Sequence, residues 1–304
     1  MNDHMKTIFI VNPRAQKKSA AEIEQTIQRK FHSVPFEIRY TYFPGHATDL
    51  ARKAVQEANH TIVALGGDGT INEVLNGMVH SDSVLGIIPS GTANDLASYY
   101  QIPRNLEQAC DVLLRRKVRQ ADVVQVNDRF YLTAGGLGFP SEVAALANVI
   151  KNRSWFGILL GKILSHQIYL LALLVAIFKT EHHRLVKVTY QNQLMKCDIL
   201  SLMINNQPFL GKKFLMAPGA INNDGLLDIC LIKNSKTRAQ ILFILTKVLN
   251  GSHIHSPSVL SWQTDFLTIE TEHPRVFLND GEIMEESDKF EVRILTRALS
   301  VIVP

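Results

Sequence analysis

The sequence predicts a Rossmann-like α/β domain with a doubly wound, mostly parallel sheet, followed by an antiparallel β-sandwich domain. The chain has 304 residues, which is long for a single hydrophobic core. Apolar and amphipathic segments alternate over residues 1–125, whereas later apolar segments follow a period of two with turn signals between them. We therefore expect domains at 1–125 and 126–295, with a final strand near 296–304 returning to the first domain.

Five strands and five helices are expected in the first domain. Continuous apolar runs such as 62–65 suit strands that are covered on both faces, and a spacing of three to four suits helices. In chain order the strands are 7–11, 36–43, 61–65, 83–89 and 121–126, and the helices are 19–31, 47–58, 70–79, 94–100 and 106–116. Ligands of such sheets bind beyond the carboxyl ends of the strands.

The second domain is expected to be mainly antiparallel strands. These are 184–190 and 194–205, joined by a turn at Gln191–Asn192, then 225–232, 266–271, 275–279, 289–295 and 299–304, with an inserted helix at 237–250. An apolar segment near 156–178 is interrupted by His166 and Gln167 and is shorter than the roughly 20 residues of a membrane span. We interpret it as a core or interdomain helix, with a lipid-facing helix left open.

Composition narrows the function classes. Hydrophobic residues make up 46% and charged residues 20% of the chain, as in ordinary globular proteins. The net charge of +4 favours anionic ligands or an anionic membrane surface but is too weak to indicate nucleic acid. Three scattered cysteines and an apolar N-terminal run too short for a signal peptide predict a cytoplasmic protein.

The segment GGDGTINE, residues 66–73, forms a glycine-rich turn between a strand and a helix. Gly66 and Gly67 would let a ligand approach the backbone closely. Thr70 and Glu73 fit a capping box, so we expect the helix to begin at Thr70 with free amides facing an anion such as phosphate. Asp68 would hold Mg²⁺ through water or orient a nucleophile, although a plain turn with a capping aspartate is the alternative.

Two further turns have the same design. Ser90, Gly91 and Thr92 follow the strand at 83–89, and Thr92 to Asp95 imitates a second capping box. A polar turn, residues 12–17, follows the first strand. Because carboxyl ends of parallel strands share one edge, the three turns predict a nucleotide site, although the P-loop and G-x-G-x-x-G motifs are absent.

GGDGTINEVLNG together with PSGTAND resembles the diacylglycerol kinase catalytic family, which includes sphingosine and ceramide kinases. The likeness extends over nearly the whole chain, through the Asn12-Pro13 turn, AGGLGF from Ala134, NDGLLD from Asn223 and NDGE from Asn279. It is strongest to compact bacterial lipid kinases. The resemblance implies an ATP- and Mg²⁺-dependent kinase that phosphorylates a hydroxyl of a diacylglycerol-like membrane lipid.

The resemblance also implies roles for individual residues. The nucleotide would contact Asn12, Pro13, Arg14, Ala15, Gln16, Lys17, Thr41, Gly66, Gly67, Asp68, Gly69, Thr70, Ile71, Asn72, Ser90, Gly91 and Thr92. Asp68, Asp95 and Asp122 would organise the catalytic Mg²⁺, and Asp68 and Glu282 would be catalytic, Glu282 as the general base. Ile221, Asp224 and Leu226 would hold a second, structural metal.

Simpler structural roles remain open for several of these residues. Asp95 and Asp122 could be a helix cap and a strand-end turn residue, and Asn279 to Glu282 is also an ordinary hairpin turn. Lys162, which matches a lysine that the family places near the site, could be a snorkelling side chain. Two departures from the family pattern are the missing glycine in residues 12–17 and Pro140 in place of an aspartate.

Two other functions are kept as alternatives. One is an NAD-kinase-like phosphorylation of a soluble acceptor, since the G-G-D-G-T loop also occurs in NAD kinases. The other is a non-catalytic nucleotide- or lipid-binding protein. For the lipid kinase we expect peripheral contact with an anionic membrane and no nucleic-acid partner, and a homodimer is left open.

Overall fold

The chain is described from a computed structural model, which covers residues 6–15, 18–58, 60–153, 175, 184–211, 213–234 and 237–304. It divides into two compact units. The first unit combines Met1–Thr133 with Asn222–Gly225 and Ile294–Pro304, and the second combines Ala134–Ile221 with Leu226–Arg293. Each unit has its own fold and is described separately.

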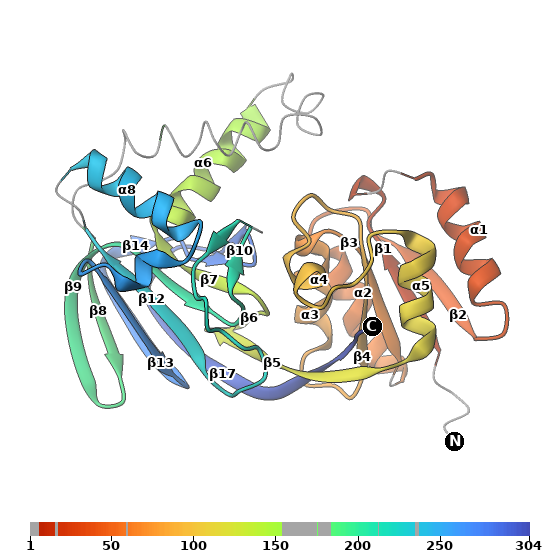
Figure 1. The fold of residues 1–304 in the computed structure, drawn as a ribbon. Coiled ribbons are helices and arrows are strands. Elements are labelled where there is room, and N and C mark those ends of the chain that lie inside the picture. Colours follow the sequence, from red (N-terminus) through yellow and green to blue (C-terminus); the bar gives the residue numbers. More distant parts are fainter. Residues whose placement is uncertain are drawn as a thin grey trace. The chain divides into compact units, whose positions relative to one another are not determined.

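The first unit contains a parallel sheet with the strand order β2-β1-β3-β4-β17, as Figure 1 shows. Its strands are β1 (Thr7–Val11), β2 (Phe36–Tyr40), β3 (Thr61–Gly66), β4 (Val84–Pro89) and the end of β17 (Ser287–Ile302). The hairpin of β5 (Val118–Val126) and β6 (Arg129–Tyr131) and the short helix η1 (Pro13–Ala15) belong to the same unit.

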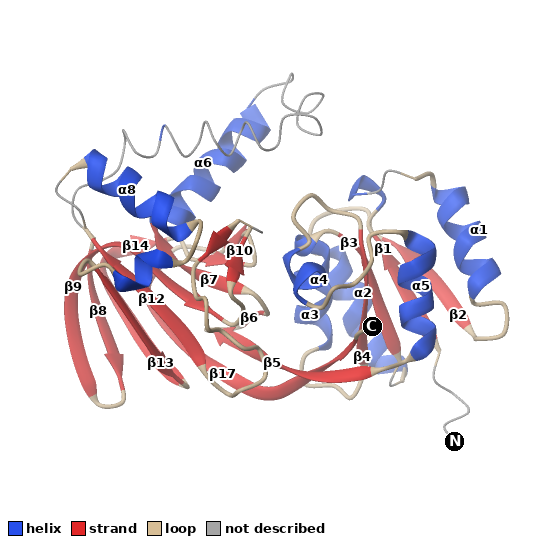
Figure 2. Ribbon diagram, viewed as in Figure 1, coloured by secondary structure: helices blue, strands red, loops and turns tan. Residues whose placement is uncertain are grey.

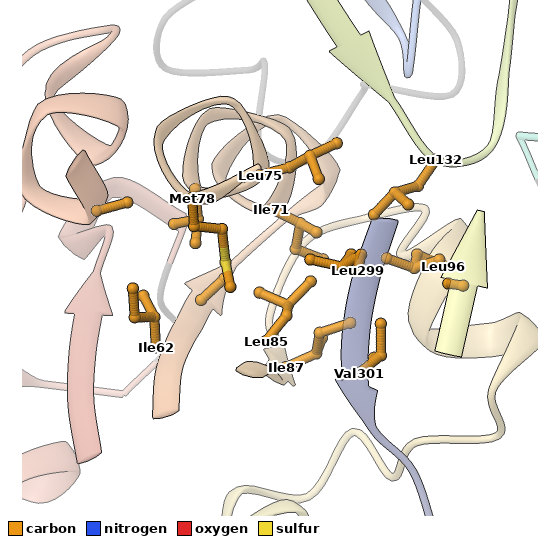
Figure 3. Close-up of a cluster of buried hydrophobic side chains, with 14 of the residues drawn as sticks. Ile62, Ile71, Leu75, Met78, Leu85, Ile87, Leu96, Leu132, Leu299 and Val301 are labelled. Carbon is orange, nitrogen blue, oxygen red and sulfur yellow. The ribbon is translucent and has the colours of Figure 1, made fainter. Parts of the chain in front are cut away.

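Helices cover both faces of this sheet. They are α1 (Ala20–Lys30), α2 (His46–Glu57), α3 (Asp68–Met78), α4 (Asp95–Tyr99) and α5 (Leu106–Arg115). Because side chains alternate along a strand, Ile8 and Ile10 of β1 pack with α2 and α3, whereas Phe9 and Val11 pack with α1 and α5. Figure 3 shows the first of these two cores. The predicted doubly wound sheet is thus confirmed.

The second unit is built from antiparallel strands. They are β7 (Ala134–Gly138), β8 (Leu185–Tyr190), β9 (Gln193–Asn205), β10 (Phe209–Leu210), β11 (Phe214–Leu215), β12 (Leu227–Lys233), β13 (Val259–Thr264), β14 (Phe266–Arg275), β15 (Leu278–Asn279), β16 (Glu282–Ile283) and the start of β17. The long strand β9 pairs with β8 through its first half and with β7 and β12 through its second, so it links β8 to the strands β7 and β12.

Helices α6 (Phe139–Arg153) and α8 (Arg238–Val248) and the short helix η2 (Ser252–His255) lie in the second unit. Figure 2 shows α8 along the strands of this unit, and its buried residues Ile241, Ile244 and Val248 share a core with Met203 of β9 and Cys230 of β12. The antiparallel sandwich-like fold of this part of the chain is as predicted.

Several boundaries differ from the sequence prediction. The helix predicted at 70–79 begins at Asp68, so Thr70 lies inside its first turn. The strand predicted at 36–43 ends at Tyr40, before two exposed aromatic residues. The two strands predicted at 289–295 and 299–304 form the single strand β17, and β13 was not predicted.

The predicted apolar helix near 156–178, including Lys162, lies outside the described residues apart from position 175. Where the structure does describe the chain, each helix is too short or too polar to cross a bilayer.

Candidate functional site

Two glycine loops at the carboxyl ends of β3 and β4 touch through their backbones. A Cβ atom added to Gly91 would lie 2.5 Å from Cα of Gly67, and one added to Gly67 would lie 3.2 Å from Cα of Gly91. The amide of Ser90 donates a hydrogen bond of 2.8 Å to the carbonyl of Gly66. Only glycine permits this approach, so the predicted pair of loops is brought together at one edge of the sheet.

Asp68 joins the second loop to the first. Its two carboxylate oxygens accept hydrogen bonds of 2.7 Å from the amides of Asn94 and Asp95. These amides begin α4, so the negative charge of Asp68 caps that helix from the neighbouring loop. Asp68 therefore fixes the position of the β4–α4 loop, whatever else it binds.

The expected capping boxes are wrong, and the structure gives other roles to their residues. Thr70 is buried, and its hydroxyl accepts a hydrogen bond of 3.0 Å from the side chain of Asn12. Glu73 accepts from the amide of Ala47 at the start of α2, 3.0 Å away. Through Asn12, Thr70 connects the β1 loop to the start of α3, and its side chain packs so closely on Gly66 that a Cβ there would lie only 2.4 Å away.

At the second predicted capping box, Asn94 rather than Thr92 stands before α4. Asn94 has a positive φ of 54° and is 1% exposed. Its side chain bonds both the amide and the carbonyl of Gly91, at 2.8 and 2.9 Å, which closes the loop on itself. Sequence reasoning did not assign Asn94 to the site, although asparagine tolerates the left-handed conformation more readily than other non-glycine residues.

The first loop is held by Asn12. Its side-chain oxygen accepts a hydrogen bond of 3.0 Å from the main-chain amide of Arg14. Its main-chain amide donates a hydrogen bond of 3.0 Å to the carbonyl of Leu65. Pro13, Arg14 and Ala15 form η1, whereas Gln16 and Lys17 lie outside the described residues.

The remaining predicted nucleotide contacts are placed as follows. Gly69 and Ile71 lie in the first turn and a half of α3, where the side chain of Ile71 belongs to the hydrophobic core. The side-chain amide of Asn72 donates to the carbonyl of Phe130 in β6 at 3.0 Å. The carbonyl of Thr92 accepts from the guanidinium of Arg104 at 3.3 Å, which puts an unpredicted positive charge beside the second loop.

An exposed aromatic cluster follows β2. Thr41 is buried and its amide donates to the carbonyl of Val11, but Tyr42 and Phe43 are 71% and 57% exposed. The imidazole of His46 stacks on both rings, with centroid separations of 5.5 and 4.5 Å. This cluster was missed because the segment was interpreted as strand; an aromatic pair directly after Thr41 was the available signal.

Asp122 is fully buried and binds main-chain amides. One carboxylate oxygen accepts from Gly225 and the other from Arg297, each at 2.7 Å. Its own amide donates to the carbonyl of Asn222, whose side chain donates to the Tyr100 hydroxyl at 2.6 Å. Burial raises the pKa of Tyr100 to about 12. Asp122 thereby attaches two separate chain segments, Asn222–Gly225 and the end of the chain from Ile294, to the first unit.

The predicted acidic set is not assembled as a direct ligand cage. Across the described residues, no three His, Cys, Asp or Glu side chains gather in a way that could hold a metal ion. In the second predicted set, Asp224 belongs to the first unit, and Ile221 and Leu226 are assigned to the second.

Glu282 lies in the second unit, on the hairpin β15–β16. Asn279 pairs with Glu282 across the turn, and Asp280 and Gly281 both have positive φ, 46° and 87°. This is the backbone of a tight two-residue hairpin. The amide of Asp280 donates to the carbonyl of Ala134 at 3.1 Å, which anchors the turn to β7 and leaves Glu282 exposed.

A cavity of about 130 Å³ with a mixed polar and apolar lining lies where β7 meets α6 in the second unit. Its walls include Ser141, Glu142 and the buried side chain of Arg184, which forms two hydrogen bonds of 2.6 Å with Glu142. Pro140 occupies the first turn of α6, where a missing amide donor costs nothing. A helix-start role thus accounts for proline at this position.

The fold and these loops define the class of protein: a Rossmann-like α/β unit with glycine-lined strand ends, combined with an antiparallel sandwich unit. Comparisons with known proteins agree. Residues 6–126 match the family model described as diacylglycerol kinase catalytic domain. Residues 141–303 match the model described as YegS C-terminal NAD kinase beta sandwich-like domain.

Similar proteins extend over almost the whole chain. A relative named "Diacylglycerol kinase" from Bacillus subtilis (strain 168) is 27% identical, over 90% of this chain and 88% of its own. One named "Probable lipid kinase YegS-like" from Enterobacter sp. (strain 638) is 27% identical over 100% and 98%. A solved diacylglycerol kinase structure from Bacillus anthracis str. Sterne aligns with a TM-score of 0.72 and 21% identity, over 100% and 98% of the two chains, and supports the fold.

The chain belongs to the diacylglycerol kinase family, with a YegS-type C-terminal domain. It is therefore a kinase, and membership of this family implies the use of ATP.

Proposed function

We propose that this kinase transfers the γ-phosphoryl group of ATP to a hydroxyl of a diacylglycerol-like membrane lipid. One observation carries the proposal: the two glycine loops after β3 and β4 are in backbone contact and are locked by Asp68 in a chain of this family. Phosphoryl transfer depends mainly on positioning and charge stabilisation, which is what a rigid, amide-lined loop pair can supply.

The nucleotide would lie across the carboxyl ends of β4, β3, β1 and β2, in that order along the sheet. Amides of the two glycine loops would bind the phosphates, and Arg104 beside Thr92 would add positive charge. Asn12 and Thr70 would hold the first loop against the phosphate loop. The exposed rings of Tyr42 and Phe43, which follow β2, would offer a flat apolar surface to the adenine base.

The donor set fits a magnesium ion that arrives with the nucleotide. Mg²⁺ keeps several waters and takes only one or two carboxylates plus substrate phosphates, so a three-carboxylate cage is not required. Each oxygen of Asp68 accepts a hydrogen bond from an amide, and a carboxylate oxygen has two lone pairs with which it can accept. We propose that Asp68 and Asp95 orient the metal's waters and that Asp122 acts through the segments it holds. The ion would neutralise charge developing on the phosphates.

Glu282 is proposed as the general base that aligns the lipid hydroxyl. It is an exposed carboxylate on a short, anchored hairpin, and its position matches the NDGE motif of the family. The base needs to accept one proton and hold the attacking oxygen in line. The structural metal at Ile221, Asp224 and Leu226 is also a proposal, since carbonyl and carboxylate oxygens suit a hard cation.

The acceptor is proposed to be met at a membrane surface. The lipid-kinase names of the relatives and the net charge of +4 support this. The cytoplasmic location remains a prediction from the sequence, and a homodimer is left open.

The test is transfer from radiolabelled ATP to diacylglycerol in mixed micelles with Mg²⁺, using the parent and Glu282→Gln. We expect the variant to lose at least about a hundredfold in kcat, since general-base catalysis contributes about 10²–10⁴. Glu285→Gln is the matched control, because Glu285 is another exposed carboxylate close by in the chain. Full activity of Glu282→Gln would refute the assigned base.

Parallel arms separate the alternatives. NAD in place of lipid tests the soluble acceptor, and phosphorylation of NAD but of no lipid would replace the proposal by an NAD-kinase-like function. Calorimetric binding of ATP without turnover on diacylglycerol, phosphatidylglycerol or a sphingoid base would indicate a non-catalytic protein. Replacing Mg²⁺ with excess chelator is expected to abolish transfer.

A further inference from the structure

Helix α8 is apolar on two sides, and only one side is covered by the core of the second unit. Ile241, Ile244 and Val248 are buried. On the other side Leu242 and Phe243 are 48% and 61% exposed, and Leu249 at the helix end is 52% exposed. Positions 242, 246 and 249 lie on one stripe of a helix, with 243 beside them. We call Leu242, Phe243 and Leu249 the outer face of α8.

The segment that carries this face is purely basic. Residues 229–264 contain Lys233, Lys236, Arg238 and Lys247 and no aspartate or glutamate. Lys247 holds its ammonium 4.6 Å from the centroid of the Phe243 ring, so the charge and the exposed aromatic side chain are presented together. Large apolar side chains next to cations are the composition of helices that lie in a membrane interface.

We propose that the outer face of α8 is the surface by which this protein docks on an anionic lipid bilayer. Leucine and phenylalanine would enter the boundary between headgroups and acyl chains, and Lys247 and Arg238 would remain among the anionic headgroups. A second copy of the chain fits this face less well. Two such faces in contact would bring basic residues together with no acidic residue in the segment to balance them.

The inference deepens the proposed function, because a docked protein reaches a lipid acceptor without extracting it from the bilayer. The role of the docking face in reaching the lipid acceptor rests on the proposed function, whereas docking itself is tested by vesicle binding alone. Each basic side chain near an anionic surface strengthens binding by about fivefold, and inserted apolar side chains add to this. Neutral vesicles should therefore bind far more weakly than anionic ones.

The experiment is flotation of the full chain with vesicles of phosphatidylcholine alone or of phosphatidylcholine with phosphatidylglycerol. We expect the parent to float with the anionic vesicles and to be released by high salt. The double variant Leu242→Ser/Phe243→Ser should lose about tenfold or more in binding, and Lys247→Glu should lose binding to anionic vesicles. Leu194→Ser, at a leucine on β9 that is 62% exposed, is the control and should bind as the parent does.

Kinase assays separate this inference from the proposed function. The double variant should keep its kcat on a dispersed short-chain diacylglycerol and show a raised KM for vesicle-embedded lipid. If the double variant loses vesicle binding and the parent phosphorylates no lipid, the docking face is supported and the proposed lipid acceptor is rejected.

Three results would overturn the docking face. The first is vesicle binding by the double variant equal to that of the parent. The second is a smaller oligomer for the double variant than for the parent on gel filtration, which would assign the face to contact with a second copy of the chain. The third is a fall in melting temperature as large as that from a core substitution, which would show that another part of the chain covers the face.

Discussion

Replacing Gly91 with alanine is the most direct test of the glycine-loop site. The new methyl group would lie 2.5 Å from Cα of Gly67 and 2.8 Å from the side-chain oxygen of Asn94. Both neighbours are held: Gly67 stands between β3 and α3, and Asn94 bonds Gly91 itself. The two loops must therefore separate by about 1 Å to reach ordinary contact distance.

The expected cost follows from this overlap. Inserting a methyl group into a packed site costs about 1–3 kcal/mol. Since about 1.4 kcal/mol is a factor of ten, ATP binding should weaken by about 5- to 150-fold. Gly67→Ala should have a much smaller effect, because its added Cβ would lie 3.2 Å from Gly91 and needs a shift of only a few tenths of an ångström.

Isothermal titration with ATP and Mg²⁺ measures this effect, and thermal unfolding shows whether the chain remains folded. Gly219→Ala is the control, because nothing lies within 4 Å of a Cβ at Gly219. The expected order of affinity is parent and Gly219→Ala together, then Gly67→Ala, then Gly91→Ala. If Gly91→Ala binds ATP as tightly as Gly219→Ala, the two loops do not form the phosphate site.

Three further predictions follow from described contacts. Asp122→Asn should lower the melting temperature by about 2–10 °C, because an amide accepts through one oxygen only and its NH2 group would face the main-chain amide of Gly225 or Arg297. Asp128→Asn, on the exposed β5–β6 turn, is the control and should change the melting temperature little. Equal melting temperatures for the two variants would show that these hydrogen bonds do not stabilise the fold. Burial lowers the pKa of His253, so the unfolded chain binds more protons than the folded one, and the free energy of unfolding in urea should fall as pH drops from about 7.5 to below about 6.5. The part of this pH dependence that comes from His253 should disappear in His253→Gln. An unchanged pH slope in that variant would contradict the prediction. Tyr42→Ala and Phe43→Ala should each raise the KM for ATP by about tenfold with kcat unchanged, because each removes a ring that contacts adenine. A fall in kcat alone would show that the adenine ring binds elsewhere.

The fold class could be predicted because its signals are local. Residues 61–65 form a continuous apolar strand and Gln191–Asn192 form the expected hairpin turn, both with positive φ. Motif recognition also identified the family. Helix starts were less accessible: Thr70 and Glu73 fit a capping box by spacing, yet their side chains bond Asn12 and Ala47, which are distant in sequence.

Features missed from the sequence depend on contacts between segments. The side chain of Asn94 bonds the backbone of Gly91, while the main-chain amides of Asn94 and Asp95 donate to Asp68 from the neighbouring loop. Strand β17 was divided in two because Arg297, with a positive φ of 51°, interrupts the alternation while the hydrogen-bonded strand continues. The roles assigned to Glu282 and to the metal-binding residues remain predictions, because they concern ligands rather than the folded chain alone.

Strand β17 has a consequence for how this protein is made. Its end pairs with β4 in the first unit, and Arg297 within it donates to Asp122. Among the described strands β17 is the last to leave the ribosome during translation. Until then the edge of β4 that it will pair with is exposed in the nascent α/β unit. A fragment cut after Thr133 would keep that bare edge permanently and should aggregate, so the ATP-binding half cannot be isolated by simple truncation.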